Sequence, residues 1–280
     1  MTHPTRTLKV ALLQMCACTQ AATNLATVQS AIAQAAQANA DLLLTPEMTT
    51  VLDRRPGALL AQATHQEDEP SLVALCALAR QHQLDVLLGS LAVKVDAQRL
   101  ANRSLLINRQ GSIVAQYDKI HLFDAVLGEQ ERYQESARFV AGQAAVVARN
   151  AGYALGLTVC YDLRFASLYR DLALAGADIL TVPSAFTVPT GQAHWHTLLR
   201  ARAIETGCFV LAPAQHGQHE DGRCTYGHTL VVNPWGEVIA EKTEGTGLLM
   251  AELDLQQVHA ARQKIPSLQH TRPYRLEVRP

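Results

Sequence analysis

Short apolar runs alternate along the chain with longer stretches rich in alanine and leucine, and this alternation limits the folds open to it. The apolar runs have the length of buried strands, and the longer stretches have the spacing of helices with one apolar face. Strands that alternate with helices predict a layered α/β protein, with sheets inside and helices outside. With 48% hydrophobic and 18% charged residues, the chain has the composition of a globular protein.

The expected elements follow one another without an obvious linker. We expect strands at residues 8–14, 41–45, 85–89, 155–160, 178–182 and 208–212, and helices at residues 23–38, 71–82, 166–175 and 194–206. Thr23 is the expected cap of the first helix, and residues 104–117 and 229–240 are predicted hairpins. Because the chain shows no low-complexity segment and no internal repeat, we predict a single domain over residues 1–280.

Two segments lack a regular pattern. Residues 122–143 form a long polar stretch, and long loops in compact domains are usually functional. Residues 266–280 contain prolines and arginines and are expected to pack as an extended arm.

Charge and cysteine content narrow the partners and the compartment. A net charge of -1 gives no electrostatic reason to bind nucleic acid or an anionic membrane. No apolar stretch is long enough to span a bilayer, and the first residues lack the plan of a signal peptide. The six cysteines have neither zinc-site nor disulfide spacing, so we expect reduced thiols in a cytoplasmic protein.

Cys160 is the first candidate for chemistry. It ends the buried apolar run that starts at Tyr153, and Asp162 and Arg164 follow it closely. Side chains at the carboxyl ends of parallel strands form the sites of α/β proteins, so a thiol there is a candidate nucleophile. The alternative is a small buried hydrophobe, which is the commoner role of a free cysteine.

Two more charged residues follow predicted strands. Glu47 comes after residues 41–45, and Lys119 comes after residues 112–117. If these strands and the strand of Cys160 are neighbours and parallel, a carboxylate, an ammonium and a thiol converge. Glu47 would then take the proton of the thiol, and Lys119 would stabilise negative charge on sulfur and on a developing oxyanion. Taken singly, each charge is also explained as a solvated group or half of an ion pair.

Three segments also resemble, in order and separation, the three motifs of the nitrilase or carbon–nitrogen hydrolase superfamily. They are residues 45–47 (Thr-Pro-Glu), 117–123 (Tyr-Asp-Lys-Ile-His-Leu-Phe) and 156–164 (Gly-Leu-Thr-Val-Cys-Tyr-Asp-Leu-Arg). The resemblance implies an α-β-β-α sandwich that pairs into a dimer, and a triad of Glu47, Lys119 and Cys160. It also implies cleavage of a non-peptide C–N bond through a Cys160 thioester, with no metal and no organic cofactor.

The family often adds a second glutamate between the lysine and cysteine motifs. Glu129, Glu131 and Glu135 are available, and Glu135 followed by Ser136 matches the family pattern best. The resemblance therefore implies that Glu135 orients the substrate amide or assists the base. We expect Glu129 and Glu131 to be solvated loop charges.

Within the family, several segments resemble the deaminated-glutathione amidases, which release α-ketoglutarate and cysteinylglycine. They are residues 183–187, 194–195, 199–206, 214–217 and 226–228. The alternatives are an ω-amidase acting on α-ketoglutaramate, another small aliphatic amidase, or a carbamoyl hydrolase. A binding or scaffold protein is disfavoured, because a scaffold has no need of the three triad residues together.

A keto-acid substrate requires an anion-binding group near the nucleophile. Arg164 is the best candidate, because a guanidinium grips a carboxylate with two hydrogen bonds. Its alternative is an ion pair with Asp162 or Glu205. Phe186 and Thr187 are expected to line the pocket, and Tyr161 to lend a backbone N–H to the oxyanion.

The remaining residues receive structural interpretations. The pairs His194/His196 and His216/His219 lack the i, i+4 spacing of metal ligands on one helix, so we predict no metal site. His194 and Trp195 are expected to anchor a helix start. Arg200, Arg202 and Glu205 are expected to form ion pairs on their helix. The helices at 166–175 and 194–206 are the predicted dimer interface.

Overall fold

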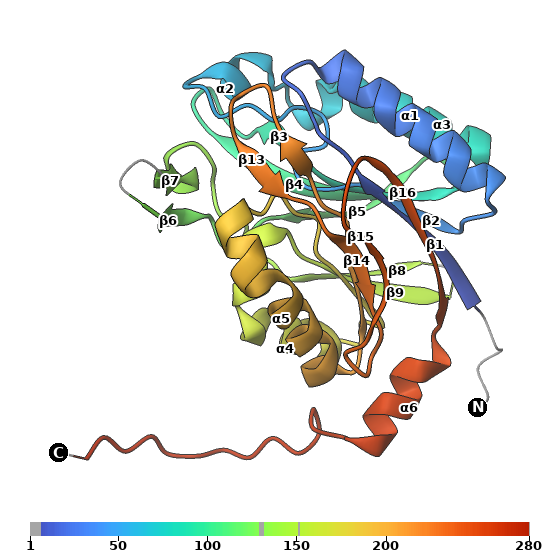
Figure 1. Ribbon diagram of the computed structural model, residues 1–280, viewed down its shortest axis with the longest axis vertical. Helices are drawn as coiled ribbons and strands as arrows, with labels where there is room; N and C mark the ends of the chain where they lie inside the picture. The colour runs from blue at the N-terminus through green and yellow to red at the C-terminus, as the bar shows by residue number, and fades with distance from the viewer. Residues whose placement is uncertain (1–6, 129–131, 151, 280) are drawn as a thin grey trace.

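Two facing six-stranded sheets form the centre of the molecule (Figure 1). The computed structural model describes residues 7–128, 132–150 and 152–279. In order across the first sheet lie β16 (Gly247–Asp254), β1 (Thr7–Gln14), β2 (Leu42–Leu44), β3 (Asp85–Lys94), β4 (Leu100–Ile107) and β5 (Ile113–Asp118). In order across the second lie β15 (Val238–Lys242), β14 (Thr229–Val232), β11 (Phe209–Ala212), β10 (Ile179–Thr181), β9 (Tyr153–Leu157) and β8 (Val146–Asn150).

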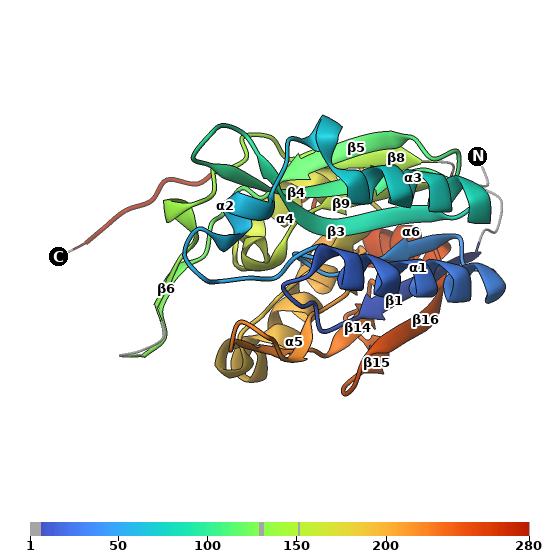
Figure 2. The same ribbon diagram turned by 90° about the horizontal axis from the view of Figure 1, so that it is seen from above.

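Helices cover the outer face of each sheet. The helices α1 (Ala21–Gln37) and α3 (Pro70–His82) pack on the first sheet, and α4 (Ala166–Leu174) and α5 (Val188–Thr206) pack on the second (Figures 1 and 2). The short helices α2 (Ala58–Gln62) and α6 (Gln256–Lys264) lie outside these layers. The predicted α-β-β-α sandwich is therefore confirmed.

The apolar pattern of the strands explains the layers. Along β1, Val10 and Leu12 enter the core between the two sheets, whereas Ala11 and Leu13 enter the core beneath α1, where Val28 packs. Successive side chains of a strand point to opposite faces, so a strand that is apolar at every position fills two cores at once. No described helix is long and apolar enough to cross a bilayer.

Two predicted helix starts are wrong. The helix α1 begins at Ala21 after Gln20, so Thr23 lies inside the first turn and is not its cap. The helix α5 begins at Val188, six residues before the expected start, because Pro189 is tolerated in a first turn. Gly191 lies inside that helix, where a Cβ would come within 2.2 Å of the ring of Tyr226.

The two irregular segments also differ from expectation. Residues 122–143 contain a hairpin of β6 (Asp124–Val126) and β7 (Arg132–Gln134), followed by a 3-10 turn (Glu135–Ala137). The C-terminal tail is extended as predicted but projects from the body (Figure 2), and Tyr274 and Val278 are each 90% exposed. The expected packing of this arm is therefore wrong beyond Thr271, which contacts Arg170.

Candidate active site

The three candidate catalytic side chains meet between the two sheets. Glu47 follows β2 and Lys119 follows β5 in the first sheet, whereas Cys160 follows β9 in the second. The strands β3 and β4 separate β2 from β5, so the condition that the three strands are neighbours is wrong. The three side chains converge because the carboxyl ends of β2 and β5 in the first sheet lie opposite the carboxyl end of β9 in the second. The expectation of neighbouring strands in a single sheet did not include this arrangement.

Lys119 is the centre of a buried ion cluster. Its side chain is 2% exposed, and its Nζ donates to Glu47 Oε1 at 2.9 Å and to Glu135 Oε2 at 2.9 Å. The Glu135 Oε2 also accepts from the Phe123 amide at 2.6 Å. The structure thus places Glu135, chosen from three loop glutamates, in the same cluster as Glu47 and Lys119. Glu129 and Glu131 lie outside the described residues.

Both oxygens of Glu47 are occupied. Oε1 accepts from Lys119 and from Asn102 Nδ2 at 2.9 Å, and Oε2 accepts from the Ala185 amide at 2.9 Å. The Cys160 thiol interacts with the same carboxylate, because the charge of Glu47 and a hydrogen bond to it raise the pKa of the thiol. Donors from both sheets therefore hold the carboxylate beside the thiol in one orientation.

Cys160 has an unusual backbone conformation. Its φ is +49°, in the left-handed region that residues other than glycine rarely adopt. Cys160 is the first residue of a 3-10 turn (Cys160–Arg164). Its amide donates to the Pro183 carbonyl at 3.0 Å, which fixes the turn. Backbone strain of this kind persists where the surroundings enforce it, and it is concentrated at functional sites.

Burial and charge set the protonation states of the cluster. Burial and the charge of Glu47 raise the pKa of Cys160 well above its ordinary value, against the opposing effect of Lys119. Burial raises the pKa of Glu47, but the charge of Lys119 and its hydrogen bonds outweigh burial and lower it. Burial lowers the pKa of Lys119, and the charges of Glu135 and Glu47 outweigh it and raise the pKa well above the ordinary range. The resting site therefore holds a neutral thiol against an ionised carboxylate.

The backbone at Glu47 is fixed by its neighbours in space. Gly89 lies so close that a Cβ would stand 1.9 Å from the Thr45 carbonyl oxygen, so only glycine fits beneath this turn. The Glu47 carbonyl accepts from Gln215 Nε2 at 3.0 Å, and the Met48 amide donates to Ser90 Oγ at 2.9 Å.

Asp162 ties the lysine segment to the cysteine turn. Its Oδ2 accepts from the Tyr117 hydroxyl at 2.7 Å and from the Val159 amide at 2.9 Å. Its Oδ1 accepts from the His121 amide at 3.0 Å and lies 2.7 Å from His121 Nδ1. Tyr117 and His121 flank Lys119, so one buried carboxylate joins the segment of Lys119 to the turn of Cys160.

Arg164 lies among aromatic rings near Cys160. Its guanidinium carbon is 5.8 Å from the ring centre of Tyr161 and 5.7 Å from that of Phe186, and both terminal nitrogens lie 3.3 Å from His194 Nδ1. Over the described ranges it has no ion-pair partner, and Glu205 pairs with Arg202 at 2.9 Å instead. The alternative ion pair of Arg164 with Asp162 or Glu205 is therefore wrong.

The other sequence assignments are mixed. Phe186 packs on Trp195 with ring centres 4.8 Å apart, and the Thr187 hydroxyl lies 2.8 Å from the Thr190 hydroxyl at the start of α5. His194 and Trp195 lie inside α5, so neither anchors its start. Arg202 and Glu205 form the expected ion pair, but Arg200 donates to the Gly236 carbonyl at 2.7 Å.

Two groups that donate hydrogen bonds to Glu47 were not predicted from the sequence. Asn102 begins an Asn-Arg-Ser sequence, which has the pattern of a glycosylation site. In the structure its side-chain amide donates to Glu47 Oε1 at 2.9 Å and to Glu135 Oε1 at 3.1 Å. Little in the sequence singles it out, because Asn102 is the first of three consecutive polar residues, with Arg103 and Ser104, in the strand β4. The Ala185 amide had no signal, because a backbone group carries no sequence identity.

Comparison with known proteins agrees with this geometry. The family model described as carbon-nitrogen hydrolase matches residues 9–263. A protein of Yersinia enterocolitica named deaminated glutathione amidase is 37% identical over 94% of this chain and 92% of its own length. The Homo sapiens protein of the same name is 39% identical over 94% of this chain and 82% of its own length.

Solved structures share the fold. The Caenorhabditis elegans NitFhit protein superposes with a TM-score of 0.90 at 35% identity, over 96% of this chain and 66% of that one. A mutant amidase from Nesterenkonia sp. AN1, whose title describes covalent addition of an acetamide moiety at the active site cysteine, has a TM-score of 0.82. It is 27% identical over 97% of this chain and 96% of that one. This chain belongs to the carbon–nitrogen hydrolase family, and it is an enzyme that hydrolyses carbon–nitrogen bonds.

Proposed function

We propose that the protein is an amidase that cleaves deaminated glutathione into α-ketoglutarate and cysteinylglycine. The observation that carries the proposal is the buried cluster of Glu47, Lys119 and Glu135 with its carboxylate against the Cys160 thiol. Relatives of that name at 37% and 39% identity, aligned over most of their length, support the choice of substrate.

The first half of the reaction forms a thioester. Glu47 takes the thiol proton as the Cys160 sulfur bonds to the amide carbon, and the carbonyl oxygen becomes an oxyanion. The Lys119 ammonium and a backbone N–H after Cys160, that of Tyr161, stabilise this charge. Glu47 then gives its proton to the amine nitrogen, the C–N bond breaks, and the amine leaves.

The second half releases the acid. A water molecule gives a proton to Glu47 while its oxygen attacks the thioester carbon, which forms a second oxyanion at the same place. Collapse breaks the C–S bond, and the proton on Glu47 returns to the sulfur. Glu135 keeps Lys119 charged throughout, and it orients the amide from the loop side of the cluster.

Arg164 recognises the keto-acid carboxylate in this proposal. Both terminal nitrogens lie 3.3 Å from His194 Nδ1, but Arg164 has no carboxylate partner within the described ranges. A guanidinium without a carboxylate partner near a nucleophile suits bidentate binding of an anion. The rings of Tyr161 and Phe186 both lie beside the guanidinium, and we expect Thr187, which follows Phe186, to line the same pocket.

The deciding experiment measures release of α-ketoglutarate, coupled to glutamate dehydrogenase. Deaminated glutathione and α-ketoglutaramate are compared side by side, with Cys160→Ala as the blank and Cys224→Ala as the matched control. Preference for deaminated glutathione, lost with Cys160→Ala and kept with Cys224→Ala, is the expected result. Preference for α-ketoglutaramate would instead make the enzyme an ω-amidase. Hydrolysis of simple aliphatic amides or carbamoyl compounds alone would overturn the substrate class.

We also propose that the protein is cytoplasmic, has one domain per chain, and forms a homodimer or a higher homo-oligomer. Six free thiols support a reducing compartment, and the exposed Leu174 and Ile204 support a partner on α4 and α5. A monomer in size-exclusion chromatography with light scattering would contradict the dimer, and Leu174→Glu with Ile204→Glu is expected to dissociate it.

A further inference from the structure

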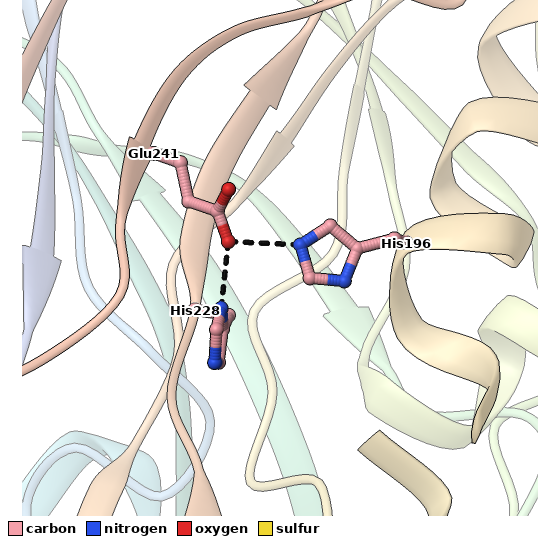
Figure 3. Close-up of side chains that lie close together, drawn as sticks. All are labelled: His196, His228 and Glu241. Carbon is pink, nitrogen blue, oxygen red and sulfur yellow. Dashed lines mark hydrogen bonds and ion pairs between the residues drawn. The ribbon is translucent and has the colours of Figure 1, made fainter. Parts of the chain in front are cut away.

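A second cluster of ligand-type side chains lies apart from the catalytic cluster. His196 of α5, His228 of the turn before β14 and Glu241 of β15 point toward one another (Figure 3). Glu241 Oε1 lies 2.8 Å from His196 Nε2 and 2.6 Å from His228 Nδ1. The three ligand atoms all lie within 4.8 Å of one another.

We propose that these three residues bind a zinc ion. Two imidazole nitrogens and one carboxylate oxygen form a ligand set that zinc accepts, with a water molecule in the fourth position. Each imidazole must then carry its proton on the other ring nitrogen, so that Nε2 of His196 and Nδ1 of His228 present lone pairs. The ion takes the place of the two hydrogen bonds to Glu241.

The distances require a small adjustment. Ligand bonds of about 2.0–2.2 Å in a tetrahedron place neighbouring ligand atoms about 3.3 Å apart. The N–O separations of 2.8 and 2.6 Å are shorter than this by about 0.5 and 0.7 Å, so Glu241 must move away from both imidazoles when the ion enters. Exposed fractions of 35% for His196 and 26% for Glu241 give them room to do so, and leave the ion accessible to water.

The surrounding contacts hold the two histidines in position. His228 has a φ of +57°, its ring stacks on Tyr226 with centres 4.2 Å apart, and its carbonyl accepts from Trp195 Nε1 at 2.9 Å. His196 follows Trp195 directly on the helix. Two ligands are therefore oriented before the ion arrives, which lowers the ordering cost of binding.

The proposed ion links parts of the second layer that are distant in sequence. It would connect α5 to β15, which is the edge strand of the second sheet. Trp195 lies between this cluster and Phe186, the expected wall of the substrate pocket. We therefore assign the ion a structural role, and no step of amide hydrolysis passes through it.

The test measures zinc binding by competition with a chromogenic chelator at neutral pH. Wild-type protein, stripped of metal, is expected to take up one zinc ion per chain and to show a higher Tm with zinc than without. His196→Gln and His228→Asn are expected to weaken binding at least about 30-fold and to remove the Tm shift. Asparagine is chosen at 228 because it tolerates a positive φ.

Matched controls separate this site from incidental binding. His259→Gln removes an exposed histidine from α6 and is expected to leave zinc binding unchanged. Cobalt in place of zinc is expected to give the intense visible bands of a tetrahedral site in the wild type and in His259→Gln alone. Absence of micromolar binding in the wild type, or equal binding by His196→Gln and wild type, would overturn the proposal. The amidase assay tests the proposed substrate independently, because amide hydrolysis does not depend on this ion.

Discussion

Glu47 and Glu241 are two carboxylates with similar donors and opposite surroundings. Each accepts two side-chain N–H groups at Oε1, from Lys119 and Asn102 in one case and from His196 and His228 in the other. The Glu47 side chain is 6% exposed and also uses its second oxygen, whereas the Glu241 side chain is 26% exposed. The difference shows that burial decides whether a carboxylate is held in one orientation or can adjust, because water can replace lost partners only at Glu241.

Removing the base is expected to have the largest effect. Glu47→Gln should lower kcat about 10³-fold, because a positioned general base contributes roughly 10²–10⁴-fold. Iodoacetamide should also modify Cys160 more slowly in this variant. Glu205→Gln, which removes a carboxylate paired with Arg202, is the matched control and should keep wild-type kcat. Wild-type activity in Glu47→Gln would assign the base elsewhere.

Removing the charge of Lys119 tests whether the cluster around Glu47 is shielded from water. Lys119→Met leaves Glu47 and Glu135 facing each other without a counter-charge. Breaking a buried pair in this way costs about 3–5 kcal/mol of unfolding free energy, which urea titration measures. The double variant Lys119→Met with Glu135→Gln should recover part of the loss. A single variant as stable as wild type would show that the cluster is far better hydrated than its exposure indicates.

Asn102 tests whether the orientation of Glu47 matters beyond its charge. Asn102→Leu removes hydrogen bonds to two ionised carboxylates, each worth about 1.5–3 kcal/mol, and should lower kcat at least about tenfold with KM little changed. Asn102→Asp should lower it further, because a third carboxylate joins the cluster.

The control lies on the same strand. Ser104→Ala removes a hydroxyl that donates to the Leu88 carbonyl, away from the cluster, and should leave kcat unchanged. A loss of stability in Asn102→Leu with unchanged kcat would make Asn102 a structural residue only.

The charged residues of the cluster could be predicted from the sequence, but the hydrogen-bond donors that hold them in place could not. Glu47, Lys119 and Cys160 follow strands that were recognisable from apolar runs, so their common location could be inferred from strand ends. The expected arrangement of those strands in one sheet was wrong, because an apolar run does not reveal which of two sheets it joins. Asn102 and the Ala185 amide escaped notice because hydrogen bonds across the sandwich leave no local pattern.

The zinc candidate illustrates the same limit. Spacing arguments examined His194 with His196 and His216 with His219, which are close in sequence. His196, His228 and Glu241 are brought together by the packing of α5 against the β14–β15 hairpin. The start of α5 was also predicted too late, although Pro189 in its first turn is compatible with the earlier start.

Without metal, Glu241 is expected to matter little for stability. Glu241→Gln keeps the shape of the side chain and weakens two hydrogen bonds that water can replace. The free energy of unfolding should therefore change by about 1 kcal/mol or less in metal-free urea titrations. A loss as large as that of Lys119→Met would remove the contrast between the two carboxylates.

The smallest expected effect is that of pH on activity between pH 6 and pH 8. The proposed mechanism needs Glu47 ionised and Cys160 protonated at rest. The pKa of Glu47 is lowered from 4.5 and that of Cys160 is raised well above 9.0, so neither group titrates in this interval. We expect kcat to vary less than about twofold there.

The free energy of unfolding should also depend on pH through this cluster, falling at low pH because of Glu47 and at high pH because of Lys119. The lowered pKa of Glu47 gives stability that is present above pH 4.5 and is lost as the pH falls through the folded value. The raised pKa of Lys119 gives stability that is complete below pH 10.5 and is lost as the pH rises through the folded value. A rate profile with an inflection near neutral pH would contradict this account of the cluster.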